Sequence, residues 1–163
     1  MPARDEADAA FSRFVAQSRA TLTRAAWFLC GDTELAADLV QDVYVKTYVA
    51  WGRVRRDEAL TYARRVLVNT NIDRLRRRRP ETPLGTHDLA DPYDAPGAIA
   101  ERDRMAQWLA VLPLRQRQVV VLRYVQDLSE QETAEVLGVS VGTVKSNASR
   151  AVATLRSAIP NMQ

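Results

Sequence analysis

Apolar residues in the first half of the chain recur every three or four positions, which is the spacing of one face of an α-helix. The pattern runs through residues 11–29 and ends at Gly31, a residue type that commonly closes a helix. It returns between Thr33 and Trp51 and again between residues 58 and 79. The sequence therefore predicts three helices before residue 80, and no segment alternates apolar and polar residues as a half-buried strand does. The positions expected to face inward in the third helix are Leu60, Ala63, Val66 and Leu67.

The second half shows the same helical spacing from residue 98 onward. A fourth helix is predicted to stop before Pro113, which suits the first position of a fifth helix running through Tyr124. Ser129, with Glu132 three residues later, has the form of a capping box. We therefore expect a short sixth helix to open there.

A helix-turn-helix is predicted at the C-terminal end of the chain. Gly138 can end the sixth helix and Ser140 can cap a seventh, while small Ala134 lets the two helices cross at a steep angle. The outer side of the last helix contains no acid through Arg156, as expected of an element that enters the major groove of DNA. The alternative is a helical hairpin that binds nothing. The outward residues are Ser140, Thr143, Lys145, Ser146, Ser149 and Arg150, and the expected buried positions are Val144, Ala148, Val152 and Leu155.

Residues 80–97 separate the two helical halves. Four of the seven prolines lie in this segment, which also has four acidic residues and no Lys or Arg, so it has too little apolar content to fold by itself. A chain of 163 residues is long enough for one ordinary domain or two small ones. We predict an all-α protein with a domain over residues 5–79, a flexible acidic linker over residues 80–97 and a second domain over residues 98–160.

Positive charge is concentrated before the linker, although the net charge is only +3. Residues 53–79 hold ten arginines against three acidic residues. The run at 76–79 has two interpretations, because cations at a helix C-terminus stabilise the helix dipole and can equally contact DNA phosphates. The sequence leaves both readings open.

The predicted second helix has a second stripe besides its core face. Asp38, Gln41 and Asp42 continue into apolar Val45 and Tyr48, which suits either a solvated face or a protein partner with a basic surface. Aromatic residues also allow two interpretations. We expect Trp27 in the core, whereas Trp51 and Tyr62 fit either the core or stacking on unpaired bases.

Several function classes are not expected. A single cysteine, Cys30, and a single histidine, His87, are too few for the usual metal sites, so we expect no metal, no cofactor and no catalytic residues. The longest apolar run, residues 25–30, is shorter than a signal or membrane segment, which favours a cytoplasmic protein without a membrane partner.

Three stretches together resemble the extracytoplasmic-function (ECF) sigma factors of the bacterial sigma-70 family. They are AADLVQDVYVKTYVAW at 36–51, YARRVLVNTNIDRLRRRR at 62–79, and residues 112–156 with LPLRQRQVVVLRYVQDLS and AEVLGVSVGTVKSNASRA. The resemblance covers about residues 11–159, and the order of the three stretches is more specific than the helix-turn-helix alone. Asn147 and Ala148 depart from the family pattern, which leaves base preference at those positions open.

The resemblance implies a three-helix region 2 before the linker and a four-helix region 4 after it. It implies that Asp38, Gln41, Asp42 and Tyr48 bind the β′ clamp helices of core RNA polymerase, with region 4 near the β flap. It assigns the last helix to the minus-thirty-five duplex, and an anti-sigma factor is a candidate regulator. The residues implied to contact the minus-ten strand are Arg53, Arg55, Arg56, Tyr62, Arg65, Asn69, Arg74, Arg77 and Arg78.

The leading hypothesis is therefore a non-enzymatic sigma factor that directs promoter recognition and transcription initiation. The alternative is a stand-alone dimeric helix-turn-helix regulator of duplex DNA. A nuclease would need a cluster of metal-binding carboxylates or a catalytic histidine on an ordered element.

Overall fold

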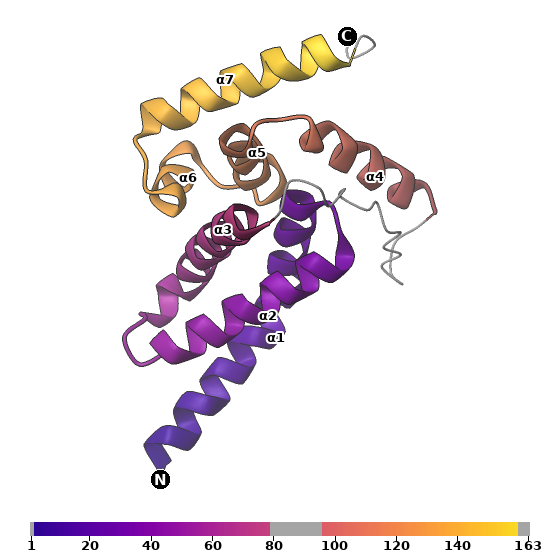
Figure 1. Ribbon diagram of the computed structural model, residues 1–163. Coiled ribbons are helices and arrows are strands. Elements are labelled where there is room, and N and C mark those ends of the chain that lie inside the picture. Colours follow the sequence, from indigo (N-terminus) through magenta and orange to yellow (C-terminus); the bar gives the residue numbers. More distant parts are fainter. Residues whose placement is uncertain (1, 79–95, 160–163) are drawn as a thin grey trace.

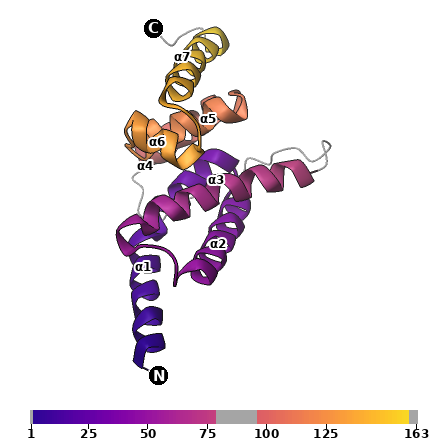
Figure 2. The same cartoon turned by 90° about the vertical axis from the view of Figure 1, so that its left-hand side faces the viewer.

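The computed structural model describes residues 2–78 and 96–159, and all regular structure in these ranges is helical. Residues 80–95 of the predicted linker and His87 lie outside them. Figures 1 and 2 show two groups of helices, one built from the N-terminal part of the chain and one from the C-terminal part. The elements are α1 (Pro2–Cys30), α2 (Thr33–Ala50), η1 (Arg56–Glu58), α3 (Ala59–Arg77), α4 (Pro96–Ala110), α5 (Leu114–Val120), η2 (Val121–Val125), α6 (Glu130–Leu137) and α7 (Val141–Ala158).

The first three long helices form the N-terminal group. Gly31 takes φ +68°, in the region that favours glycine, and so lets the chain reverse between α1 and α2. Asp32 then caps α2 by accepting a hydrogen bond from the backbone N–H of Leu35 at 3.0 Å. The three predicted helices are confirmed, with the single turn η1 preceding α3.

The C-terminal group matches the predicted succession of helices with three differences. The helix α4 begins at Pro96, inside the segment predicted as linker. The predicted fifth helix is two elements, because α5 ends at Val120 and the next five residues form the wider turn η2. Pro113 lies just before α5 rather than in its first position.

Some positions predicted to be buried are not. Leu60 and Val66 are only partly buried at the edge of the core, as are Ala148 and Leu155, and Val152 is 39% exposed. The core position on α7 is instead Ala151, seven residues after Val144, and both are fully buried. Seven residues bring a helix back to within about 20° of its starting direction, whereas eight turn it about 80° away.

The two groups share one core rather than standing apart. Leu109, Leu112, Val121 and Ala151 of the C-terminal group belong to the same buried cluster as Leu22 and other residues of α1, α2 and α3. A second cluster joins Val68 of α3 to Leu122, Leu128 and Val136. Figure 1 accordingly shows α6 lying beside α3, and the turn η2 and α4 contact α1.

Polar contacts reinforce the packing between the groups. Arg117 of α5 donates hydrogen bonds to the Leu29 carbonyl of α1 at 3.1 Å and to the Leu109 carbonyl of α4 at 2.9 Å. Gln126 donates to the Thr21 carbonyl at 3.2 Å and accepts from Arg64 at 3.1 Å. Burial lowers the pKa of both guanidinium groups, Arg64 and Arg117.

Candidate functional site

The exposed face of α2 carries the predicted acidic and apolar stripe. Asp38 and Gln41 are exposed, as are Val45 at 55% and Tyr48 at 44%. The face extends to Val49, which is 75% exposed and was not among the predicted residues. Its position four residues after Val45, outside the core stripe, is a signal that the sequence contains.

Tyr48 contacts the N-terminal part of α1. Its hydroxyl donates to Asp8 Oδ1 at 2.9 Å, and the ring packs edge-on to Phe11 with the ring centroids 5.0 Å apart. The hydrogen bond and the negative charge of Asp8 raise the pKa of Tyr48. The side chain is therefore held in place while its ring remains partly exposed.

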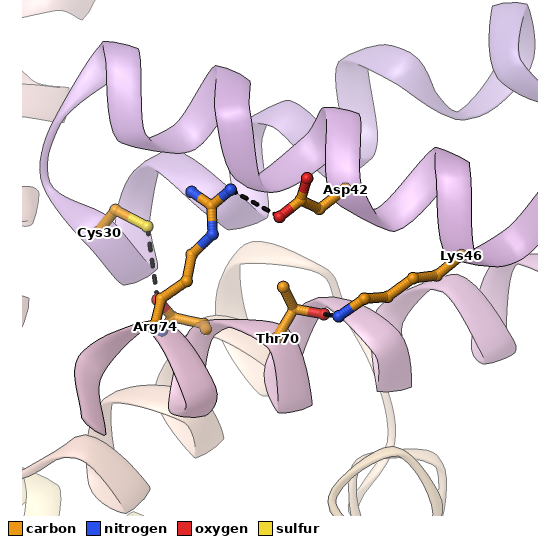
Figure 3. Close-up of polar contacts among 6 residues, drawn as sticks. Cys30, Asp42, Lys46, Thr70 and Arg74 are labelled. Atoms are coloured by element: carbon orange, nitrogen blue, oxygen red, sulfur yellow. Dashed lines mark hydrogen bonds and ion pairs between the residues drawn. The ribbon is translucent and has the colours of Figure 1, made fainter. Parts of the chain in front are cut away.

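Two side-chain contacts cross the seam between α2 and α3 (Figure 3). Arg74 of α3 forms an ion pair with Asp42 of α2, with Nη2 and Oδ2 2.7 Å apart. One turn further along α2, Lys46 Nζ donates to Thr70 Oγ1 at 3.0 Å. The structure therefore joins a residue implied to bind polymerase, Asp42, to a residue implied to bind DNA, Arg74.

The segment between α2 and α3 holds three of the predicted DNA-binding arginines. Arg53 is exposed, and Arg55 pairs with Asp57 at 2.9 Å. The guanidinium of Arg56 lies over the Trp51 ring, 3.9 Å from the centroid, and donates to the Trp51 carbonyl at 2.8 Å. This cation–π contact fixes the turn that leads into α3.

Trp51 belongs to the core in this structure. It is 4% exposed, its indole N–H donates to the Ala7 carbonyl at 3.1 Å, and it packs against Phe11 and Phe14. Trp27 is also buried, as predicted, and Tyr62 is half-buried. Trp51 therefore presents no open face for a base to stack on.

The arginines of α3 occupy different environments. Arg65 is exposed and donates to the Glu135 carbonyl of α6 at 3.3 Å, while Arg64 is buried between the two helix groups. Asn69 is exposed. Neighbouring Asn71 is buried, accepts the Cys30 thiol at 3.6 Å, and keeps a buried amide nitrogen without a hydrogen-bond partner.

The basic run at the end of α3 is exposed or half-buried as far as the structure describes it. Arg76 and Arg77 are exposed and Arg78 is half-buried, while Arg79 lies outside the described residues. Arg76 and Arg77 belong to the last turn of α3, where their charges stabilise the helix dipole. This placement agrees with both interpretations of the run.

The helix-turn-helix forms as predicted. Glu132 N–H donates to Ser129 Oγ at 3.0 Å and Ser129 N–H donates to Glu132 Oε2 at 2.7 Å, which completes the capping box. The hydrogen bond from the Ser129 backbone N–H to the Glu132 carboxylate lowers the pKa of Glu132, and the Ser129 side chain lowers it further. Gly138 takes φ +65° at the turn, and Ala134 packs with Val144 of α7 and Val119 of α5 where the helices meet.

The predicted outer residues of α7 divide into two kinds. Ser140 caps the helix by accepting the Thr143 N–H at 3.1 Å, and the two hydroxyls lie 2.9 Å apart. Lys145, Ser146, Ser149 and Arg150 are exposed, and the Lys145 ammonium lies 3.7 Å from a Glu130 carboxylate oxygen. The first two residues therefore have a structural role at the helix start besides any contact they make with DNA.

No group of three potential metal ligands gathers among the described residues. Cys30 is partly buried at the end of α1 beside α3, and burial raises the pKa of its thiol to about 11. In the same ranges, no helix combines the length and apolar character needed to cross a membrane.

Comparison with known families assigns both halves of the chain. Residues 14–81 match the family described as Sigma-70 region 2, and residues 102–155 match the family described as Sigma-70, region 4. The RNA polymerase sigma-E factor of Streptomyces avermitilis is 40% identical over 149 residues, covering 90% of this chain and 83% of that protein. The ECF RNA polymerase sigma factor SigM of Mycobacterium tuberculosis is 32% identical over 147 residues, covering 90% and 75% respectively.

A solved structure shows the same fold. The co-crystal structure of sigma factor RpoE with the anti-sigma factor NepR, from Bartonella quintana, matches with a TM-score of 0.78 and 20% identity, covering 94% of this chain and 98% of that one. The N-terminal group matches sigma-70 region 2, and the C-terminal group, which contains the helix-turn-helix, matches region 4. This combination defines the class of sigma-70 transcription initiation factors. The chain belongs to the sigma-70 family of RNA polymerase sigma factors, and its relatives include ECF members. This membership favours the sigma factor over the stand-alone regulator.

Proposed function

We propose that the exposed face of α2 is the surface by which this sigma factor binds core RNA polymerase. The proposal rests on one observation: acidic Asp38 and Asp42 continue directly into exposed Val45, Tyr48 and Val49 on one helix. Apolar side chains at such exposure suit burial by a partner, and adjacent carboxylates favour a partner with basic side chains. The β′ clamp helices are the proposed partner, with region 4 near the β flap.

The remaining predicted sites concern promoter DNA. The proposed minus-ten surface combines the 52–58 segment with α3, and the proposed minus-thirty-five surface is the outer side of α7. Arginines contact phosphates and add salt-dependent affinity, whereas the side chains of α7 contact base edges and phosphates of the duplex. Strand opening follows from tighter binding of the exposed strand than of the duplex. The proposed domain boundaries are residues 5–79 and 98–160.

Regulation and location complete the proposal. The RpoE structure contains an anti-sigma factor, and this chain shares its fold. An anti-sigma factor is therefore the proposed regulator. The proposed location is the cytoplasm, where core polymerase and promoter DNA are found. The protein is proposed to act by binding and not as an enzyme.

Charge reversal on α2 tests the polymerase contact. Asp42→Arg places a cation against the proposed basic partner surface, so we expect loss of comigration with purified core polymerase in gel filtration. Glu34→Arg is the matched control, because Glu34 is exposed in the first turn of the same helix. Circular dichroism checks that both variants fold. Undiminished assembly of folded Asp42→Arg contradicts the assignment.

A further inference from the structure

The seam between α2 and α3 connects the two proposed binding surfaces through one ion pair. Asp42 and Arg74 lie 2.7 Å apart, with 47% of the Asp42 side chain and 32% of the Arg74 side chain exposed. Figure 3 shows the pair beside the Lys46–Thr70 contact, so α2 and α3 remain joined at the next turn when the ion pair opens. Each charged group can therefore be reached from solvent without separating the helices.

Asp42 and Arg74 each have a second proposed partner outside this chain, and that partner competes with the ion pair between them. A polymerase cation that pairs with Asp42 weakens the hold of this carboxylate on Arg74. A DNA phosphate that pairs with Arg74 likewise weakens its hold on Asp42. The Asp42–Arg74 ion pair is only partly buried, and such a pair contributes modest stability, so its replacement by two intermolecular pairs costs little.

We propose that Asp42 and Arg74 form an exchange pair that couples polymerase binding to DNA binding. A basic side chain of the polymerase takes Asp42, and Arg74 is released toward a phosphate of the minus-ten strand. This inference rests on the proposed function of both surfaces. Because Arg74 competes with the polymerase for Asp42, loss of Arg74 also makes Asp42 more available to the polymerase.

A double-mutant cycle on the free chain tests the exchange without polymerase. The probe is a short fluorescein-labelled single-stranded DNA, and the measurement is its affinity by fluorescence anisotropy. Asp42→Asn is expected to raise the affinity about two- to fivefold, as release of Arg74 from a partly exposed ion pair allows. In an Arg74→Gln background the same change is expected to give no more than the general effect of removing one negative charge.

Glu34→Gln measures that general effect, because it removes a carboxylate from the same helix outside the pair. The gain from Asp42→Asn is expected to exceed the gain from the Glu34→Gln control only where position 74 carries a positive charge. An equal gain from Asp42→Asn in both backgrounds overturns the exchange pair. Arg74→Lys provides a second variant that keeps the positive charge if Arg74→Gln unfolds the protein, and with it the gain is expected to persist.

The reciprocal measurement separates this inference from the proposed function. Arg74→Gln is expected to strengthen binding to core polymerase by a similar factor, about two- to fivefold. Unchanged or weaker binding of the folded variant contradicts the exchange while leaving the α2 assignment intact. Full assembly of Asp42→Arg with polymerase contradicts the proposed polymerase-binding role of α2. This conclusion does not depend on the result of the double-mutant cycle with DNA.

Discussion

Single arginines in this protein have different physical roles although they lie close together in the sequence. Arg64 is 9% exposed and hydrogen-bonds Gln126, whereas adjacent Arg65 is exposed and Arg74 pairs with Asp42. A buried guanidinium requires acceptors around it, and a surface guanidinium can exchange its partner at little cost. The high arginine content of residues 53–79 therefore does not translate residue by residue into contacts with DNA.

The basic run at the end of α3 is proposed to contact promoter phosphates. Replacement of Arg77 and Arg78 by Ala is expected to lower the salt dependence of promoter complexes, because each lost phosphate contact removes about one unit of the logarithmic slope. The slope is measured with holoenzyme and promoter DNA over a range of salt concentrations. An unchanged slope would show that the basic run does not contact DNA phosphates and only stabilises the helix dipole at a solvated helix end.

At the scale of the element, the helix-turn-helix shows why local signals in a sequence are reliable. Ser129, Glu132 and Gly138 act on backbone groups within three or four residues, so their chemistry fixes the ends of α6 regardless of the rest of the fold. The turn η2 had no such signal. In this turn the backbone N–H of Gln126 donates to the Val121 carbonyl, five residues back, at 2.9 Å. Tyr124 within the turn is 58% exposed.

The outer side of α7 carries a prediction at the element scale. Lys145→Ala with Arg150→Ala removes two exposed cations and is expected to weaken the dependence of transcription on the minus-thirty-five element. The measurement compares transcription from intact and scrambled upstream elements with wild-type and variant protein. Arg156→Ala, at the exposed far end of the same helix, is the control for charge alone. Equal transcription from both templates with wild-type protein already refutes the assignment.

At the scale of the whole molecule, the free chain holds its two halves together. Val68 of α3 is 1% exposed and packs with Leu122, Leu128 and Val136, while Arg65 hydrogen-bonds the α6 backbone. The face of α3 that is proposed to approach the minus-ten strand therefore neighbours α6. We therefore expect these contacts to open when the chain binds two separated promoter elements, as its proposed function requires.

Disruption of this interface is expected to separate the halves. Val68→Asp places an unpaired charge in a buried apolar cluster, and such a charge favours hydration over burial. We expect a larger radius of gyration in small-angle X-ray scattering with the helical content retained. Val49→Asp is the control, because Val49 is 75% exposed and lies outside the interface. An unchanged radius in the folded Val68→Asp variant contradicts a separable interface.

The sequence predicted the helices, the turn and the exposed stripe of α2 because each depends on periodicity or local capping. It did not predict the packing between the halves, since contacts such as Arg117 with the Leu29 carbonyl join residues far apart in the chain. The Asp42–Arg74 pair could not be predicted either, because its members lie 32 positions apart and were assigned to different partners. Trp51 likewise had two open interpretations until its packing against Phe11 and Phe14 placed it in the core.

Run-off transcription with core polymerase and a pool of genomic templates tests whether this chain directs promoter-specific initiation through α2. We expect discrete transcripts that require the chain and share two upstream sequence blocks. These transcripts are expected to disappear with Asp42→Arg and to persist with Glu34→Arg. Absence of chain-dependent initiation with wild-type protein, or undiminished initiation with Asp42→Arg, contradicts this function.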